Sequence, residues 1–565
     1  MGQFDVVVRA GTVVDGTGAP ARTADVAVRD GVVVEVGRVD GVGRREIDAD
    51  GCLVTPGFVD VHTHYDGQAT WDDRLAPSSW HGVTTVVMGN CGVGFAPVHP
   101  VDRDRLIELM EGVEDIPGTA LHEGLPWTWE GFEGYLDHLG GRRFDIDVAT
   151  QVPHGALRLF VMGERGARRE AATADDIVQM AAVARSAVEA GALGFTTSRT
   201  RNHRTSTGDF TPTLTAARDE LVGIAAEIGR SGRGVLQVVS DFPDFDEETE
   251  TIRAMAQVSG RPLSISVAGG PGSAVGHRRL LAFLERCNAD GLEVRGQVAA
   301  RGIGILLGMQ ATLHPFQRLG SYRALAGLPL ADRVAALRTS EVRAAVLAEA
   351  ATEPGAWNFA NVFELGDPPD YEPDPASSIE ARAAALDRPA AELAYDLLLG
   401  AEGTALLYSP VLNYGVGDLE PAREMLEHPF TIPGLSDGGA HVGTICDASF
   451  PTTLLQHWVR DRTRGPKLAV EHVVQRQCRD TAVALGLHDR GVLAPGYRAD
   501  LNVIELAALR LHPPELRFDL PAGGKRLLQR VDGYRHTFVA GEETYHDGQA
   551  TEALPGRLVR GGAVR

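Results

Sequence analysis

Cysteine is scarce in this chain, and the few cysteines form no pairing pattern. The 565 residues contain five cysteines, an odd number spread from Cys52 to Cys478 without any Cys-x-x-Cys. This spread argues against a disulfide framework and favours a reducing compartment. No basic and then apolar leader follows Met1. We therefore expect a cytoplasmic protein.

Long apolar runs and an excess of basic residues are also missing. No run approaches the roughly 18 apolar residues that a membrane-spanning helix needs. The 54 lysines and arginines are outnumbered by 76 aspartates and glutamates, which leaves a net charge of −22. Such a surface repels phosphate backbones and anionic lipids, so we expect neither nucleic acid nor membrane as a partner. A small-molecule substrate is expected instead, and the sequence leaves a homo-oligomer open.

Both ends of the chain have the residue pattern of short β-strands. They are rich in β-branched residues and carry Asp-Gly turns such as Asp547-Gly548. We expect one small β-sandwich domain built from residues 1–55 and 491–565. The expected strands are Phe4–Arg9, Thr12–Asp15, Asp25–Arg29, Val32–Gly37, Arg45–Ile47, Asp500–Leu506 and Arg535–Ala540.

Residues 56–490 alternate apolar strands with helices. One helix is signalled by Thr173 as N-cap, with Asp176 three residues on, and by Gly191 at its end; others span Ala216–Ile228 and follow Asp246. Eight such alternations predict an α/β fold, a (β/α)8 TIM-like barrel with its site at the carboxyl ends of the strands. Long insertions are expected at about 99–145 and 300–429, the second mostly helical. The expected strands are Phe58–His64, Thr84–Asn90, Asp147–Pro153, Ala192–Ser198, Val235–Ser240, Leu263–Val267, Leu292–Ala299 and Phe430–Ser436.

The segment Pro56–Asp66 carries the most informative chemical pattern. An apolar run, Phe58 to Val61, leads into His62 and His64. Alternate side chains of a strand point the same way, so both imidazoles share one face, about 6–7 Å apart along the strand. Both rings can then reach one metal at about 2.0–2.1 Å. The spacing alone is weak, but its Pro-Gly entry, apolar strand and polar exit favour a metal site.

Two further strand ends carry residues that suit a metal. Cys91 follows the second strand, although a lone cysteine is more often a small buried hydrophobe. Asp437 follows the eighth strand and would face the two histidines across a closed barrel. It can bind a metal with one oxygen and accept a proton from metal-activated water with the other. Its structural alternative is to form the turn before Gly438-Gly439.

These motifs resemble those of the N-acyl-D-amino-acid deacylases, or D-aminoacylases, of the metal-dependent amidohydrolase superfamily. The resemblance implies a (β/α)8 barrel with a small β domain, bound zinc, and hydrolysis of an N-acyl amide. In that family the strand-one histidines and the strand-eight aspartate form one metal position, so His62, His64 and Asp437 match it. A strand-two cysteine, matched by Cys91, and one histidine each from strands five and six form the other. The matching segments are Thr55–Asp66, Pro77–Pro97, Glu114–Pro117, Pro153–Arg158, Gly191–Ser198, Gly434–Asp437, Gly491–Val503 and Pro555–Arg557.

The chain departs from that pattern at strands five and six, because Val235–Asp241 and Leu263–Gly270 contain no histidine. One thiolate cannot hold zinc alone against water, so this position is expected to be empty or rebuilt. We expect one Zn2+, or another divalent metal, held by His62, His64 and Asp437, with Cys91 as a further candidate ligand. Candidates for rebuilding the second position are His154, His203, Asp241 and Gln237, each more often an ordinary hydrogen-bonding residue.

The expected function is hydrolysis of a C–N bond other than a peptide bond. We expect an enzyme that cleaves the amide of an N-acyl-D-amino acid or related small acid, with Asp437 as general base and then acid. A substrate carboxylate would suit a guanidinium fork, and His441 would suit the oxyanion or cap a turn. A cyclic-amide hydrolase, a C–C lyase or decarboxylase on the same barrel, and a non-catalytic binding protein remain alternatives. The candidate substrate-binding residues are Arg199, Arg201, Arg301, His441, His154 and His203.

Overall fold

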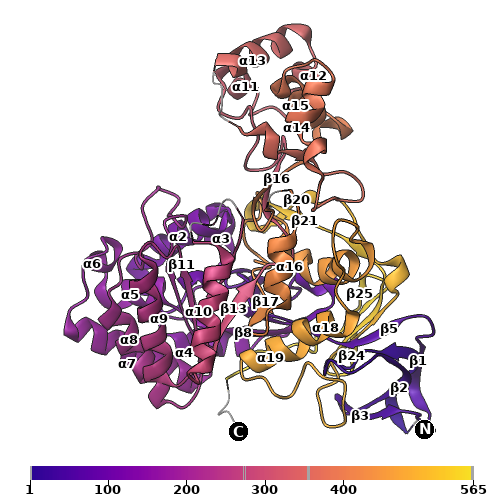
Figure 1. Cartoon of the computed structure of the whole chain (residues 1–565). Coiled ribbons are helices and arrows are strands. Elements are labelled where there is room, and N and C mark those ends of the chain that lie inside the picture. The colour runs from indigo at the N-terminus through magenta and orange to yellow at the C-terminus, as the bar shows by residue number, and fades with distance from the viewer. Residues whose placement is uncertain (1–2, 271–272, 274, 353–356, 416, 562–565) are drawn as a thin grey trace.

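One nine-stranded sheet combines the two ends of the chain (Figure 1). The computed structural model describes residues 3–270, 273, 275–352, 357–415 and 417–561. Strand β18 from the C-terminal part pairs antiparallel with β5 from the N-terminal part, Val503 opposite Val54, and both side chains are buried. The strands of this sheet are β1 (Phe4–Val13), β2 (Arg22–Arg29), β3 (Val32–Gly37), β4 (Gly43–Asp48), β5 (Leu53–Pro56), β18 (Leu501–Ile504), β23 (Tyr534–Val539), β24 (Glu542–His546) and β25 (Gln549–Ala550).

The strands predicted at both ends of the chain are present, with one correction. The segments Phe4–Arg9 and Thr12–Asp15, expected as two strands, form the single strand β1. Its pairing with β2 shifts register between Val8 and Gly11, so a local irregularity takes the place of the expected break. The turn predicted at Asp547-Gly548 joins β24 to β25.

The middle of the chain contains two sheets in which every neighbouring pair of strands is parallel. Each of the eight predicted segments overlaps a strand, and Asp147–Pro153 overlaps two. Thr63, just beyond β6, bridges to Gly438, just beyond β17, so the outer strands of the two sheets approach each other. The three-stranded sheet has the order β6 (Phe58–Asp60), β7 (Val83–Met88), β8 (Asp147–Thr150); the six-stranded sheet has the order β17 (Thr431–Pro433), β13 (Val294–Val298), β12 (Leu263–Ser266), β11 (Val235–Ser240), β10 (Gly194–Arg199), β9 (Val152–Pro153).

Two of the main helices between these strands begin at a capping side chain. Thr173 and Asp176 form the predicted capping box, in which each side chain accepts a hydrogen bond from the other's backbone N–H. One predicted start was wrong. The helix expected after Asp246 begins at Phe245, because the Asp244 side chain accepts hydrogen bonds from the backbone N–H groups of Asp246 and Glu247. The main helices are α5 (His154–Met162), α7 (Ala174–Ala190), α8 (Arg218–Arg230), α9 (Phe245–Ser259), α10 (His277–Ala289) and α16 (Glu420–Glu427).

The first long connection packs against the ends of the parallel strands. Its aromatic residues Trp129, Phe132 and Tyr135 are buried. The Tyr135 hydroxyl donates to the carbonyl of Asp66 at 2.8 Å, which ties the connection to the residues that follow His64. Its helices are α2 (Arg103–Glu114), α3 (Gly118–Gly124) and α4 (Phe132–Gly140).

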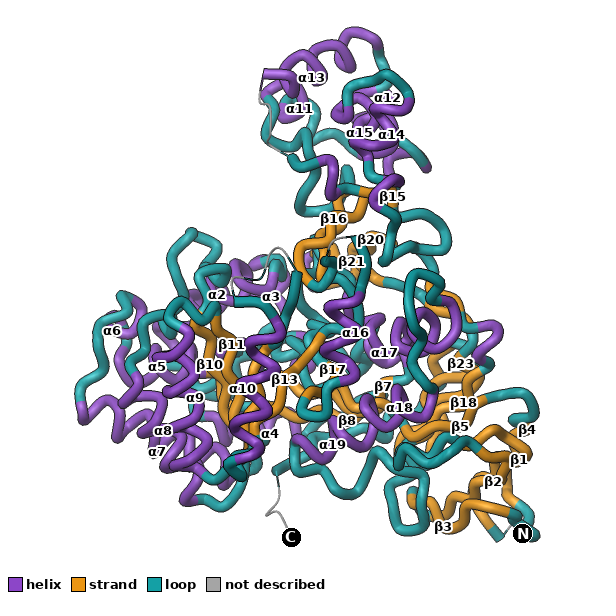
Figure 2. The backbone as a smooth tube through the Cα atoms, viewed as in Figure 1, coloured by secondary structure: helices purple, strands orange, loops and turns teal. Residues whose placement is uncertain are grey.

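The second long connection forms a lobe that projects from the body of the molecule (Figures 1 and 2). The predicted helical character is confirmed, and the lobe has its own cluster of buried apolar side chains, among them Phe316, Leu337 and Tyr395. Its elements are β14 (Ile303–Leu307), α11 (Gly320–Arg323), α12 (Leu330–Leu337), α13 (Ser340–Thr352), β15 (Phe363–Glu364), α14 (Ile379–Ala385), α15 (Ala390–Leu398) and β16 (Leu407–Leu412).

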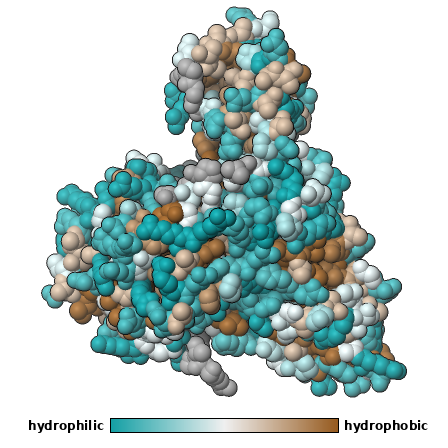
Figure 3. Space-filling view, viewed as in Figure 1, coloured by the Kyte–Doolittle hydropathy of each residue, from teal (hydrophilic) through white to brown (hydrophobic). Residues whose placement is uncertain are grey.

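The remaining elements are short and lie mostly in the C-terminal third. The last described segment returns to the parallel strands, where Leu558 bridges to Val148 of β8. The face in Figure 3 is mainly hydrophilic, with hydrophobic residues in separate patches. In the described part of the chain, no helix is long and apolar enough to cross a membrane. These elements are α1 (Gln68–Trp71), α6 (Glu164–Ala167), α17 (Phe450–Thr453), α18 (Val470–Gln475), α19 (Thr481–Ala484), β19 (Arg510–Leu511), β20 (Glu515–Leu520), β21 (Gly524–Leu528) and β22 (Val531–Asp532), with π-helical turns at Leu454–Asp461 and Arg476–Asp480.

Candidate metal centre

His62 and His64 lie side by side just beyond β6, as their spacing predicts. Their ring centroids are 5.4 Å apart, and each residue is only 1% exposed. Thr63 between them bonds the carbonyl of Val87 through both its amide and its hydroxyl, and the amide of His64 donates to the carbonyl of Gly438. These bonds hold both imidazoles on the opposite side of the chain from Thr63.

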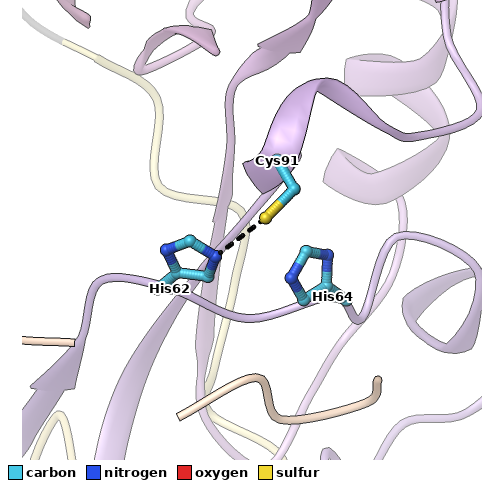
Figure 4. Close-up of side chains that lie close together, drawn as sticks. All are labelled: His62, His64 and Cys91. Atoms are coloured by element: carbon cyan, nitrogen blue, oxygen red, sulfur yellow. Dashed lines mark hydrogen bonds between the residues drawn. The ribbon is translucent and has the colours of Figure 1, made fainter. Parts of the chain in front are cut away.

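Cys91 reaches the same point from the end of β7. It lies in a short turn, Asn90–Gly92, and its Sγ is 3.3 Å from Nε2 of His62 (Figure 4). One ligand atom from each of His62, His64 and Cys91 lies within 4.8 Å of the other two. A tetrahedral zinc with arms of about 2.0–2.3 Å would hold such atoms roughly 3.3–3.6 Å apart. The three side chains therefore converge as ligands of one ion would.

Asp437 completes this group from the segment after β17. Its Oδ1 is 3.4 Å from Nε2 of His62 and 3.6 Å from Nε2 of His64. Its backbone N–H donates to the carbonyl of His62, which fixes the loop against the end of β6. Burial alone would raise the pKa of Asp437, but the imidazoles of His64 and His62 beside it hold the pKa well below its usual range. The carboxylate is therefore ionised at neutral pH.

The far side of the His62 ring is held by two glutamines on neighbouring parallel strands. Nδ1 of His62 lies 2.7 Å from Oε1 of Gln297 on β13, and that oxygen also accepts from Nε2 of Gln237 on β11 at 3.1 Å. An Nδ1–H that donates to Gln297 leaves Nε2 free to bind a metal. Gln237, a candidate for rebuilding the lost metal position, contacts the ring away from Cys91 and Asp437, because its Nε2 lies 2.8 Å from Nδ1 of His62. Gln297 was not anticipated from the sequence.

Glu114, the last residue of α2, is a second member of the site that sequence reasoning missed. Its carboxylate is buried, with Oε1 3.3 Å from Nδ1 of His64 and Oε2 3.5 Å from Nε2 of His441. Burial, and then the charges of Asp437 and Asp66, raise its pKa well above the usual value. The signal in the sequence was its position in Glu114–Pro117, one of the segments that match the family.

The buried polar atoms at this point fit a cation. Both ring nitrogens of His64 and both carboxylate oxygens of Glu114 lack a hydrogen-bond partner among the described residues. The ion-pair partners of Glu114 and Asp437 in this part of the structure are histidines and include no lysine or arginine. Unpaired buried polar groups are costly, and a divalent ion among these donors would compensate them. The residues present therefore fit a metal.

Several residues of the site have a strained backbone. Cys91, Leu435, Asp437 and His441 have φ between 49° and 57°, which non-glycine residues rarely adopt. Each such residue costs on the order of 1 kcal/mol and persists where the surroundings enforce it. Their concentration here is typical of a functional site.

The weaker candidates divide into two groups. Nε2 of His441 lies 4.0 Å from Oδ2 of Asp437. His203 bonds Ser198 at 2.9 Å. Burial, and then His441 and His64, lower the pKa of His203 to about 3. Arg201 is exposed, and its amide donates to Asp241.

The other three candidates have buried or ion-paired partners within the fold, and their place in the substrate site stays a prediction. His154 bonds Thr197 and Glu220 through its two ring nitrogens, and Arg199 pairs with Glu248 at 2.8 Å. Arg301 is 1% exposed, and its terminal nitrogens donate to the side chains of Ser449, Thr453 and Asp447 and to the carbonyl of Cys446. Burial favours such paired arrangements, so these groups are used within the fold.

Comparison with known proteins identifies a family for this chain. Residues 45–545 match the model of the amidohydrolase family. A D-aminoacylase of Alcaligenes xylosoxydans xylosoxydans is 31% identical over 231 residues, 40% of this chain and 43% of that protein. An N-acyl-D-aspartate deacylase of the same organism is 33% identical over 233 residues, 41% of this chain and 42% of that protein. The matched regions thus span less than half of these relatives.

Comparison of structures covers far more of the chain. A solved D-aminoacylase, described with a binuclear metal centre, has 25% sequence identity and a TM-score of 0.66, with 99% of this chain and 100% of that chain covered. The resemblance inferred from the motifs is confirmed, and the chain belongs to the amidohydrolase family.

Proposed function

We propose that this protein is a metal-dependent amidohydrolase that cleaves the amide bond of an N-acyl-D-amino acid or a related small N-acyl acid. The observation that carries the proposal is the convergence of His62, His64, Cys91 and Asp437 at one buried point. The substrate class comes from the matched relatives, a D-aminoacylase and an N-acyl-D-aspartate deacylase. These relatives favour amide hydrolysis over the lyase, decarboxylase and binding-protein alternatives.

The metal that fits this donor set best is one Zn2+ ion. Imidazole and thiolate donors suit zinc, whereas Mg2+ and Ca2+ prefer oxygen ligands. His62, His64 and Asp437 would hold it, with Cys91 as a further ligand. When bound, zinc would supply activation of a water molecule and polarisation of the substrate carbonyl. Strands β11 and β12 offer Gln237 and Ser264 but no histidine, which supports one ion rather than two.

Asp437 is the proposed general base and acid. Its side chain is 17% exposed and that of His441 25%, whereas the two ligand imidazoles are almost completely buried. Substrate therefore approaches from the side of Asp437 and His441. The ionised Asp437 accepts a proton from the attacking water and passes it to the leaving nitrogen.

We further propose that the two parallel sheets form one (β/α)8 barrel. The pairing of Thr63 with Gly438, and the continuation of β8 into β9, support closure at both junctions. The nine-stranded sheet would then belong to the small β-sandwich domain, with boundaries near residues 55 and 490. The cytoplasmic location and the oligomeric state stay predictions.

A substrate panel in labelled water tests the proposed reaction. The zinc-loaded protein should release the free amino acid from N-acetyl-D-amino acids faster than from the L-enantiomers. In H2(18)O, the label should enter the acetate, because water attacks the acyl carbon. Turnover of hydantoins alone would indicate a cyclic-amide hydrolase, and carbon dioxide release a decarboxylase. Zinc-loaded protein that hydrolyses no N-acyl amino acid would overturn the proposal.

A further inference from the structure

A second group of metal-binding side chains lies in the nine-stranded sheet. His536 on β23 is the direct cross-strand partner of His546 on β24, and Glu543 on β24 lies between them. Their ligand atoms all fall within 4.8 Å of one another. None of the three residues has a place in the candidate metal centre, and no step of the proposed reaction uses them.

The distances within this group suit one ion. The two Nδ1 atoms are 3.2 Å apart, and Nδ1 of His546 is 3.1 Å from Oε1 of Glu543. A tetrahedral ion with arms of about 2.0–2.1 Å separates its ligand atoms by roughly 3.3 Å, close to both values. Nδ1 of His536 is only 2.5 Å from the same oxygen, so this pair would open slightly.

The carboxylate is oriented before any ion arrives. Arg45 of β4 pairs with Oε2 of Glu543, which leaves Oε1 directed at the two rings. The side chain of Glu543 is 8% exposed and that of His546 is 53% exposed, so the group has a fixed acceptor at its base and an open side.

We propose that His536, Glu543 and His546 form a second metal site, for Zn2+ or another imidazole-binding divalent ion such as Ni2+ or Cu2+. Two imidazoles and one carboxylate suit these ions and not Mg2+ or Ca2+. Each imidazole binds through Nδ1 once its proton resides on Nε2, and water fills the open position.

A bound ion would therefore cross-link strands of the sheet that joins the two ends of the chain. The ion links β23 to β24, and through the Glu543–Arg45 pair it reaches β4 of the N-terminal part. An ion that binds only the folded protein stabilises it. Zinc should therefore raise the melting temperature even when the candidate metal centre is disabled. This inference does not depend on the proposed amidohydrolase activity.

A count of bound zinc in matched variants tests the site. The metal-free full-length protein is dialysed against micromolar Zn2+, and zinc per chain is measured by mass spectrometry. We expect two ions in the wild type, one in His546→Gln or His536→Gln, and one in His62→Gln. The zinc-dependent rise in melting temperature should persist in His62→Gln and disappear when His546→Gln is added.

His512→Gln is the matched control, because Nε2 of His512 lies 2.8 Å from Asp532 in an exposed pair without a second imidazole. It should keep both ions. The inference is wrong if His546→Gln and His536→Gln bind as much zinc as the wild type, or if His512→Gln loses as much as they do. Failure of the proposed deacylase activity would leave these counts unchanged, so the two ideas fail separately.

Discussion

Oε1 of Glu114 lies 3.3 Å from Nδ1 of His64, and the residue that carries it ends a helix of the first long connection. The opposite ring nitrogen, Nε2, faces Oδ1 of Asp437 at 3.6 Å. A carboxylate behind a metal-binding histidine holds the ring orientation and its tautomer. Glu114 therefore lies beside the ring nitrogen of His64 that faces away from Asp437; among the described residues it makes no hydrogen bond there, whereas Gln297 bonds His62.

The first prediction follows from that arrangement. Glu114→Gln should weaken zinc binding by about 10- to 100-fold, because the carboxyl group beside Nδ1 of the metal-binding His64 is lost. Competition with a chromophoric chelator measures the affinity. Glu108→Gln, on an exposed turn of the same helix, is the control and should bind zinc normally. Equal affinity in both variants would assign Glu114 a purely structural role.

Asp437→Asn should remove the general base while His62, His64 and Cys91 still offer ligands. We expect kcat to fall by about 10²- to 10⁴-fold, with a much smaller change in KM. Steady-state kinetics on an N-acetyl-D-amino acid, together with the zinc content of each preparation, separates lost chemistry from lost metal. Retention of wild-type kcat in the metal-loaded variant would exclude Asp437 as the proton acceptor.

Whether Cys91 binds the metal has a spectroscopic answer. Burial raises the pKa of its thiol well above the usual value, so a bound cation is needed to hold the thiolate. Replacing zinc by Co2+ should produce a thiolate-to-cobalt charge-transfer band that Cys91→Ala abolishes. Cys287→Ala, in a buried position of α10, should keep the band. A wild-type protein without this band would show that the sulfur is only a neighbour.

The capping box of α7 can be tested without touching the site. Thr173→Ala removes the acceptor for the backbone N–H of Asp176 and should destabilise the first turn of the helix by about 1 kcal/mol. Hydrogen exchange of the amides at the start of α7 should accelerate about fivefold, whereas Thr173→Ser should exchange as the wild type does. Unchanged exchange in the alanine variant would mean that the cap adds nothing measurable.

His81 should make stability depend on pH. It is fully buried between Thr452 and the carbonyl of Gln529, and burial lowers its pKa to about 3. The unfolded chain takes up the proton near pH 6.5 and the folded protein does not, so this contribution is present above pH 6.5 and is lost as pH falls toward 3.

His81→Gln should therefore be less stable than the wild type at pH 8, with a gap that narrows below pH 6.5 by about 1 kcal/mol per pH unit. Chemical denaturation of the two proteins between pH 8 and pH 5 measures the gap. A gap that stays constant over this range would show that His81 also titrates in the folded state.

Structural features that depend on a few neighbouring residues could be predicted from the sequence. The eight strand segments and the capping box of α7 follow from apolar periodicity and from hydrogen bonds between near neighbours, so composition and spacing sufficed. The same holds for His62 and His64, because a period of two residues places both rings on one side whatever surrounds them. The register shift of β1 and the start of α9 at Phe245 did not follow from such patterns, because they depend on strand pairing and on capping geometry.

The partners of the site residues were decided by the tertiary structure alone. Gln297 meets His62 across 235 positions of sequence, and Glu114 reaches His64 from the first long connection. Arg301 looked available at a strand end, yet it is buried against Asp447, 146 positions away. Local sequence specifies which groups can bind a metal or a proton. Which of them face a shared point depends on how distant segments pack, because burial and pairing are properties of the whole fold.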